Sequence, residues 1–142
     1  MNKKYEFTGE TKLYLGRTLH RIKALISFGN VKAGDVGGWI EKEENLSHYD
    51  NAWVSGDARV YGDARVFRNT HLMWISKIGS RNDTITFMRS KELKIIVKVG
   101  CFEGTIEEFE AKVKETHGDN EHAQAYFLAI QLAKLRIDLT EE

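Results

Sequence analysis

Four consecutive six-residue units between Asn51 and Trp74 constrain the fold more than any other feature of the chain. They read Asn-Ala-Trp-Val-Ser-Gly, Asp-Ala-Arg-Val-Tyr-Gly, Asp-Ala-Arg-Val-Phe-Arg and Asn-Thr-His-Leu-Met-Trp. Each unit opens with Asn or Asp and has a small second residue and an aliphatic fourth residue. Self-similarity at such a short period is typical of a parallel β-helix. Gly56, Asp57 and Gly62 stand where units meet and suit its corners, because they tolerate left-handed backbone angles.

The spacing inside each unit predicts which side chains are buried. The second and fourth residues are two positions apart, so their side chains point to the same face of a strand. We expect that face to form the core, with these residues buried: Ala52, Val54, Ala58, Val60, Ala64 and Val66. Residues at the alternate positions are expected to face outward: Trp53, Arg59, Tyr61, Arg65 and Phe67. An ordinary hairpin with Gly-Asp turns is the alternative.

The pattern changes after the repeats. Alternation of apolar and polar residues predicts three antiparallel strands, at Trp74–Ile78, Thr84–Arg89 and Leu93–Val99. The expected fold is mainly β with a C-terminal α+β part. A β-rich entry segment and a short β-solenoid would occupy residues 1–74, and an α+β lobe would occupy residues 75–142.

Two helices are expected to complete the C-terminal lobe. Thr105 and Glu108 match the capping box that opens a helix. Gly118 marks its end, because glycine readily takes a left-handed cap conformation. Asp119 or Asn120 caps the second helix, which is predicted to run to about residue 138. Its buried apolar stripe is expected to include three leucines: Leu128, Leu132 and Leu135.

Composition argues against several classes of partner. The chain has 21 basic and 21 acidic residues, so it carries no overall charge for binding nucleic acid or an anionic membrane. It has no apolar run long enough for a membrane span and no signal peptide at its start. The single cysteine, Cys101, cannot form an internal disulfide, which fits a reducing cytosol. One cysteine and five scattered histidines predict no metal site.

Several segments resemble a group of phage and prophage hexapeptide-repeat proteins. The resemblance rests on Gly37-Gly38-Trp39-Ile40-Glu41-Lys42-Glu43 and on the Gly-Asp-Ala-Arg-Val units, and it covers about residues 15–136. Such proteins are often labelled transferases or polymer-forming proteins by analogy of fold. The resemblance implies a left-handed β-helix and a phage origin, and hence a place in the host cell cytosol. It brings no firm activity.

A polar loop between two predicted strands is the strongest candidate for a binding site. The segment Ser80-Arg81-Asn82-Asp83-Thr84 is longer and more polar than a turn requires. Arg81 offers a planar fork that suits phosphate or carboxylate, and helix starts offer free backbone N–H groups. The predicted anion site therefore contains Arg81, Asn82 and Thr84, with His117 and Asn120. The alternative is a solvated hairpin loop beside ordinary helix caps.

The absence of a convincing nucleophile, metal cluster or general-base pair favours a protein that binds rather than catalyses, without a cofactor. Given the phage resemblance, the expected function is to counter host antiviral defence by sequestering a nucleotide signal. One alternative is direct binding of a host defence protein such as a CRISPR nuclease. Another is a hexapeptide-repeat acyltransferase using His48 or His71. The four six-residue units, called hexads below, make little more than one coil of a β-helix, which is short for a cofactor groove.

Outward aromatic side chains predict self-association. Trp53, Tyr61 and Phe67 would form an exposed apolar stripe on the repeats. Such a stripe favours a homo-oligomer, either a dimer or a trimer, or a surface for another partner. The alternative is that the N-terminal segment covers these side chains.

Overall fold

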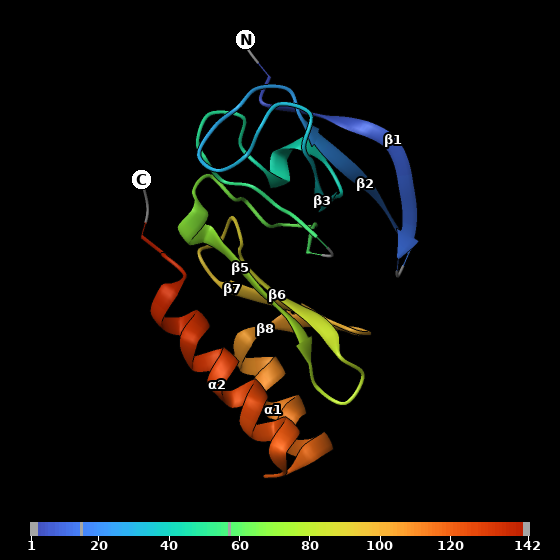
Figure 1. Cartoon of the computed structure of the whole chain (residues 1–142). Coiled ribbons are helices and arrows are strands. Elements are labelled where there is room, and N and C mark those ends of the chain that lie inside the picture. The colour runs from blue at the N-terminus through green and yellow to red at the C-terminus, as the bar shows by residue number, and fades with distance from the viewer. Residues whose placement is uncertain (1–2, 15, 57, 141–142) are drawn as a thin grey trace.

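The computed structural model describes residues 3–14, 16–56 and 58–140. It has two layers of β-structure, one above the other, with two helices against the outer face of the lower layer (Figure 1). The upper sheet has the strand order β1-β2-β3-β4 and the lower sheet β5-β6-β7-β8. The strands are β1 (Tyr5–Tyr14), β2 (Arg17–Ala24), β3 (Val36–Ile40), β4 (Arg59–Val60), β5 (Leu72–Ile78), β6 (Asp83–Arg89), β7 (Ile95–Val99) and β8 (Phe102–Thr105). The helices are α1 (Ile106–His117) and α2 (Glu121–Arg136), with short 3-10 helices η1 (Glu43–Asn45) and η2 (Asn69–His71).

The prediction of a left-handed β-helix is wrong. Both four-stranded sheets are dominated by antiparallel pairing. Within the described residues, the hexads contribute only the two-residue strand β4 to the upper sheet and the first three residues of β5 to the lower sheet. The hexads do not stack on one another. They pair in parallel with an earlier segment, through Trp39 with Arg59 and Ile40 with Val60. The antiparallel hairpin β1–β2 pairs with the other edge of β3. The strands therefore form an open four-stranded sheet and not the successive coils of a β-helix.

The burial predicted from the hexads is confirmed although the coil is not. All six inward residues, Ala52, Val54, Ala58, Val60, Ala64 and Val66, are at most 1% exposed. The inference needed only the two-residue period of extended backbone, which holds in any strand-like segment. Gly56 and Gly62 take positive φ angles of 59° and 61°, as expected at corners. Asp57, the third predicted corner residue, lies outside the described residues.

Gly37 and Gly38 allow β3 to approach the hexads closely. The Gly38 N–H donates to the Val54 carbonyl at 2.7 Å. A Cβ atom on Gly38 would lie 2.7 Å from the Ala58 carbonyl oxygen and 2.7 Å from the Val54 Cγ1 atom. Real Cβ atoms do not come so near to other heavy atoms. The two glycines are therefore required by packing, and their φ angles are not positive.

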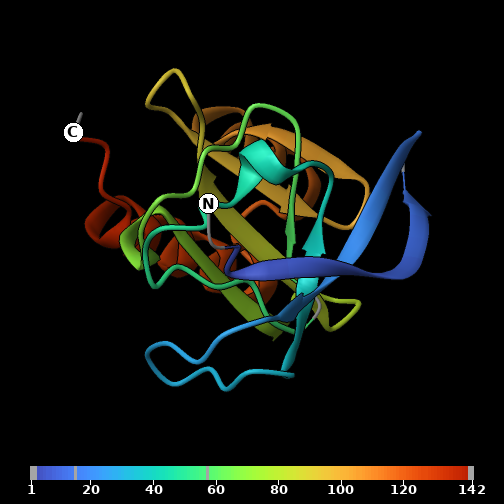
Figure 2. The ribbon, with the colours of Figure 1, turned by 90° about the horizontal axis from the view of Figure 1, so that it is seen from above.

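The N-terminal segment covers most of the aromatic stripe predicted on the hexads. Tyr61 is 4% exposed, and the Arg17 guanidinium of β2 lies 4.7 Å from its ring centroid. Trp53 is partly buried and meets the Phe28 ring edge-on at 5.5 Å. Phe67 is 42% exposed. Seen from above, the β1–β2 hairpin extends past the edge of the lower sheet (Figure 2).

The lower layer follows the sequence prediction more closely. Three of its strands fall where alternation placed them, and the fourth, β8, was not predicted. The capping box is confirmed, with the Glu108 N–H donating to Thr105 Oγ1 at 3.2 Å. Asn120 caps α2 by accepting the Ala123 N–H at 2.9 Å. Of the helices that the described residues form, none is both long and apolar enough to cross a membrane.

The buried hexad face provides a test of the core. Val60→Asp places an unpaired carboxylate where the side chain is 0% exposed, which is expected to cost more than about 4 kcal/mol and to abolish cooperative unfolding. The matched control is Val36→Asp, because Val36 is 54% exposed on β3. Thermal denaturation followed by circular dichroism compares the two variants. Equal melting temperatures for both would contradict the assigned core.

Candidate ligand site between the two sheets

The first part of the predicted anion site lies on the turn between β5 and β6. Arg81 is exposed there and forms no hydrogen bond or ion pair with another described residue. Asn82 is exposed with a positive φ of 50°, and its N–H donates to the Gly79 carbonyl at 3.2 Å. Thr84 Oγ1 lies 3.1 Å from Ser76 Oγ across the hairpin. These contacts are typical of a solvated hairpin.

The second part of the predicted site lies at the junction of α1 and α2. The Asn120 N–H donates to the His117 carbonyl at 3.2 Å, and the Asn120 side chain is engaged as a helix cap. A small cavity of about 90 Å³ beside His117 is lined by Phe109, Lys112, Val113, Thr116, His117 and Tyr126. None of the other four predicted residues lines it. Binding at Arg81 therefore stays a prediction from the sequence alone.

A larger cavity, of about 550 Å³, lies where the hexads meet the lower sheet. Its lining residues come from the third hexad, from the end of β6 and from the turn that follows, and they are Arg65, Phe67, Arg89, Ser90, Lys91, Glu92 and Leu93. Main-chain hydrogen bonds hold these segments together. The Arg65 N–H donates to the Arg89 carbonyl at 2.8 Å, and the Lys91 N–H donates to the Asp63 carbonyl at 2.8 Å. The volume is within the usual range for small-molecule sites.

The charge of this cavity favours an anion. Arg89 is 4% exposed, and burial lowers the pKa of its guanidinium. Its Nη1 donates to the Thr140 carbonyl at 2.8 Å, whereas its Nε has no partner among the described residues. Arg65 and Lys91 add two cations to the lining, and Glu92 adds one carboxylate. A guanidinium in a cavity wall is well suited to a charged acceptor.

Phe67 gives the same cavity an aromatic wall. Its ring is 42% exposed, and the Arg89 guanidinium carbon lies 5.5 Å from the ring centroid. His71 positions this part of the chain, since its Nδ1 accepts the N–H groups of Phe67 at 3.0 Å and Arg68 at 3.3 Å. Burial lowers the pKa of His71, so its ring stays neutral and available as an acceptor. An aromatic face beside cations suits a planar ring that carries a phosphate.

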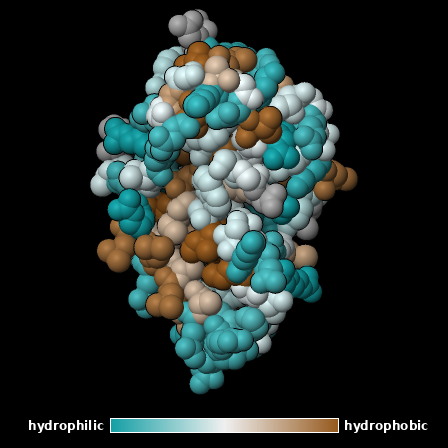
Figure 3. Space-filling model, in the orientation of Figure 1, coloured by the Kyte–Doolittle hydropathy of each residue, from teal (hydrophilic) through white to brown (hydrophobic). Residues whose placement is uncertain are grey.

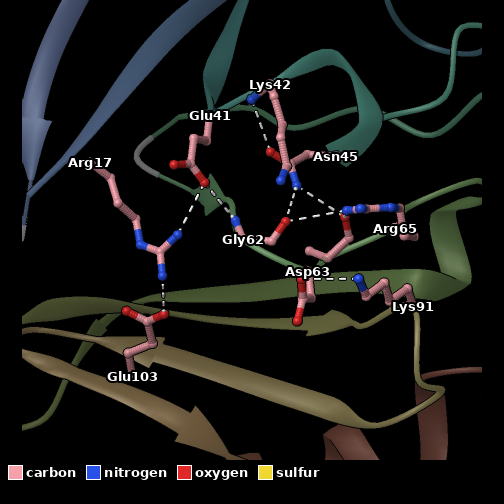
Figure 4. Close-up of polar contacts among 10 residues, drawn as sticks. Arg17, Glu41, Lys42, Asn45, Gly62, Asp63, Arg65, Lys91 and Glu103 are labelled. Atoms are coloured by element: carbon pink, nitrogen blue, oxygen red, sulfur yellow. Dashed lines mark hydrogen bonds and ion pairs between the residues drawn. The ribbon is translucent and has the colours of Figure 1, made fainter.

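A second cavity, of about 320 Å³, adjoins the first and is strongly polar. Its lining residues are Arg17, Glu41, Lys42, Tyr61, Gly62, Asp63, Ala64, Ile96 and Glu103. Arg17 bridges the two layers by pairing with Glu41 at 3.1 Å and with Glu103 of β8 at 2.9 Å (Figure 4). Asp63 lines this cavity and Lys91 lines the other, and their side chains form an ion pair of 3.8 Å between them (Figure 4).

Asn45 stabilises the chain segment that separates the two cavities. Its side-chain amide donates to the carbonyls of Gly62 at 3.1 Å and Ala64 at 3.0 Å, and it accepts the Lys42 N–H at 3.0 Å (Figure 4). Arg65 Nη1 donates to the same two carbonyls, at 3.2 and 2.8 Å. The carbonyls are therefore satisfied, and the Arg65 guanidinium is held at the cavity by its own main chain.

Residues considered for catalysis lie in structural roles. The His48 ring stacks on Tyr5 with a centroid distance of 4.1 Å, and its Nδ1 accepts the Lys4 N–H at 3.1 Å. His71 is buried, and its Nδ1 accepts main-chain N–H groups. Cys101 is exposed. Across the part of the chain that the structure describes, no group of three or more His, Cys, Asp and Glu side chains is placed to hold a metal ion.

Sequence reasoning missed the site that the geometry forms best. The expectation that Arg65 and Phe67 face outward is correct, because both side chains are partly exposed. The sequence did not, however, predict that they bind a ligand. Arg89 and Lys91 are not among the residues of the predicted anion site. The available signal was the alternation in the third hexad, which puts Arg65 and Phe67 on one face. It does not reveal that the turn after β6 lies opposite, because that is a long-range contact.

Comparison with known proteins places the chain in no established group. No protein-family model, no curated protein and no solved structure matches it. The resemblance to phage hexapeptide-repeat proteins therefore stays a prediction from the sequence.

Lys98 is a buried cation near the second cavity. It is 2% exposed, its Nζ donates to the Gly100 carbonyl, and it lies 4.4 Å from the Tyr14 ring centroid. Arg59 faces the same ring at 4.6 Å. Burial, assisted by the positive charge of Arg59, lowers the pKa of Lys98 to about 8. Lys4 is 1% exposed, and burial likewise lowers its pKa to about 8.

Lys98→Met is expected to raise the free energy of unfolding at pH 7, and the gain should shrink toward pH 9.5. Below pH 8 the lysine is charged in both states, and the folded state carries the cost of burying it. Between about pH 8 and its unfolded pKa near 10.4, only the unfolded state binds the proton, so wild-type stability rises with pH. Urea denaturation at several pH values measures this. The control is Lys94→Met, at an exposed position. A Lys98→Met effect independent of pH would contradict the assigned burial.

Proposed function

We propose that the protein is a non-enzymatic binding protein and that its ligand is a nucleotide, held in the cavity lined by Arg65, Phe67, Arg89 and Lys91. The phosphate would accept hydrogen bonds from the arginine side chains, and the base would stack on Phe67. On the phage resemblance, the nucleotide is a signal of host antiviral defence. Sequestering that signal in the host cell cytosol is the proposed function.

One observation carries the proposal: a buried arginine, two further cations and an exposed aromatic ring share one cavity of about 550 Å³. Arginine forms paired, charge-assisted hydrogen bonds with phosphate, and these are stronger in a partly dehydrated site. Base stacking on an aromatic side chain contributes about 1–3 kcal/mol. The combination favours a ligand that has both an anionic group and a planar ring over a simple inorganic anion.

The lining chemistry supports holding the ligand rather than transforming it. Neither His nor Cys is among the seven lining residues. Ser90 Oγ accepts the N–H groups of Glu92 and Lys94, both at 3.2 Å, so it is engaged in the turn. A hydroxyl without an adjacent general base is a weak nucleophile. Sequestration requires only affinity, which this arrangement supplies.

Calorimetric titration with a panel of cyclic and linear nucleotides tests the proposal. Arg65→Ala is expected to weaken binding about ten- to a hundredfold, the effect of losing a charge-assisted hydrogen bond. Lys91→Ala is expected to weaken it less, by about three- to tenfold, because Lys91 is exposed to solvent and screened. Affinity should fall as salt concentration rises.

Arg81→Ala is the matched control, because Arg81 is an exposed arginine on the distant hairpin. The cavity predicts unchanged affinity and an unchanged melting temperature for Arg81→Ala. Loss of binding in Arg81→Ala with normal binding in Arg65→Ala would instead support the site predicted from the sequence. If no nucleotide binds the wild-type protein, the proposed function is wrong.

A further inference from the structure

Helix α2 carries a row of exposed leucines on its outer face. Leu128, Leu132 and Leu135 are 69%, 45% and 83% exposed, and Leu139 follows the helix at 37%. Apolar surface gathers along α2 in the space-filling view (Figure 3). The expectation that these leucines belong to the buried stripe is wrong. The buried side of α2 consists of Ala123, Tyr126, Ala129, Ile130 and Ala133.

The spacing of these leucines matches that of a helix–helix contact. Steps of four and three residues, from Leu128 to Leu132 and from Leu132 to Leu135, keep apolar side chains on one side of a helix, as in the seam of a coiled coil. The buried side of α2 already packs against the chain's own core. The outer row is therefore not needed for the fold of one copy.

A groove lies directly beside this row. It has a volume of about 270 Å³ and is lined by Asn69, Thr70, Leu72, Met73, Leu132, Arg136 and Ile137. Leu132 belongs to both the row and the groove, so a ridge and a groove adjoin on one surface. Such a surface is self-complementary across a two-fold axis, because the ridge of each copy can enter the groove of the other.

The exposed area is suited to a weak dimer. The three helical leucines present about 350 Å² of apolar surface, within the range of about 300–600 Å² typical of functional patches on monomers. Two copies would bury about 700 Å² of leucine surface, and the groove walls would bring the total near the 1,000 Å² of the smallest specific interfaces. The area therefore favours a reversible association at micromolar or higher concentration.

We infer that two copies of this chain associate through α2, with the helices antiparallel and the two-fold axis close to Leu132. Opposed helices align their dipoles favourably. The neutral side chain of Gln131 flanks the row near the axis, so no like charges meet there. This contact does not involve the nucleotide cavity, whose lining shares no residue with the leucine row or the groove.

Sedimentation equilibrium between about 5 and 500 µM tests the inference. The wild-type protein is expected to shift reversibly from one to two chain masses over this range. Leu135→Glu should raise the dissociation constant at least about tenfold, because it places a charge in the apolar contact. The control is Leu13→Glu, at a position 77% exposed on β1, which should leave the dimer unchanged. A wild-type monomer throughout, or a dimer that Leu135→Glu leaves intact, would overturn the inference.

Disulfide trapping tests the orientation, in a Cys101→Ser background because Cys101 is exposed. Gln131→Cys lies near the proposed axis and should form a covalent dimer on oxidation. Gln124→Cys lies about 10 Å further along the helix, at 1.5 Å of rise per residue, and should remain monomeric. Cross-linking of both variants to the same extent would indicate parallel helices and would contradict the proposed arrangement.

Discussion

The contact between β3 and the hexad backbone is the interaction on which the rest of the structure depends. Gly37 and Gly38 let the carbonyls of Val54 and Ala58 approach within hydrogen-bonding reach of β3. That approach sets the parallel pairing of β3 with β4, and it buries the alanines and valines of the hexads. Because the hexad chain is held there, its other side faces the lower sheet. Both cavities between the layers form along this segment.

The boundary between the two layers combines apolar contacts, through Leu72 and Met88 of the lower sheet, with charged side chains. Arg17 joins the layers by pairing with Glu41 and Glu103, and the Asp63–Lys91 pair joins them again nearby. Ion pairs that are only partly buried contribute modestly to stability, so they are better explained by specificity of packing than by strength. The result is a seam with charged groups fixed in place, and fixed charges reduce the entropic cost of binding an anion.

Local features of this fold were predictable from the sequence, and its long-range pairings were not. Alternation correctly identified the inward residues of the hexads, and capping residues correctly identified the starts of α1 and α2. The prediction of a β-helix was wrong because a six-residue period specifies which side chains are buried but not which strand lies beside them. The leucines of α2 were misassigned for a related reason: helical spacing identifies a face, not whether that face is covered. Arg65 and Arg89 were not joined into one site because they meet only through a contact between distant segments.

The central claim is that the cavity beside Arg89, and not the hairpin carrying Arg81, binds the ligand. Chemical-shift mapping of backbone amides during nucleotide titration tests it directly, because each segment reports independently. The account predicts that the largest changes cluster at residues 65–67 and 89–93. Chemical-shift changes confined to residues 80–84 and 117–120, with residues 65–67 and 89–93 unaffected, would contradict it.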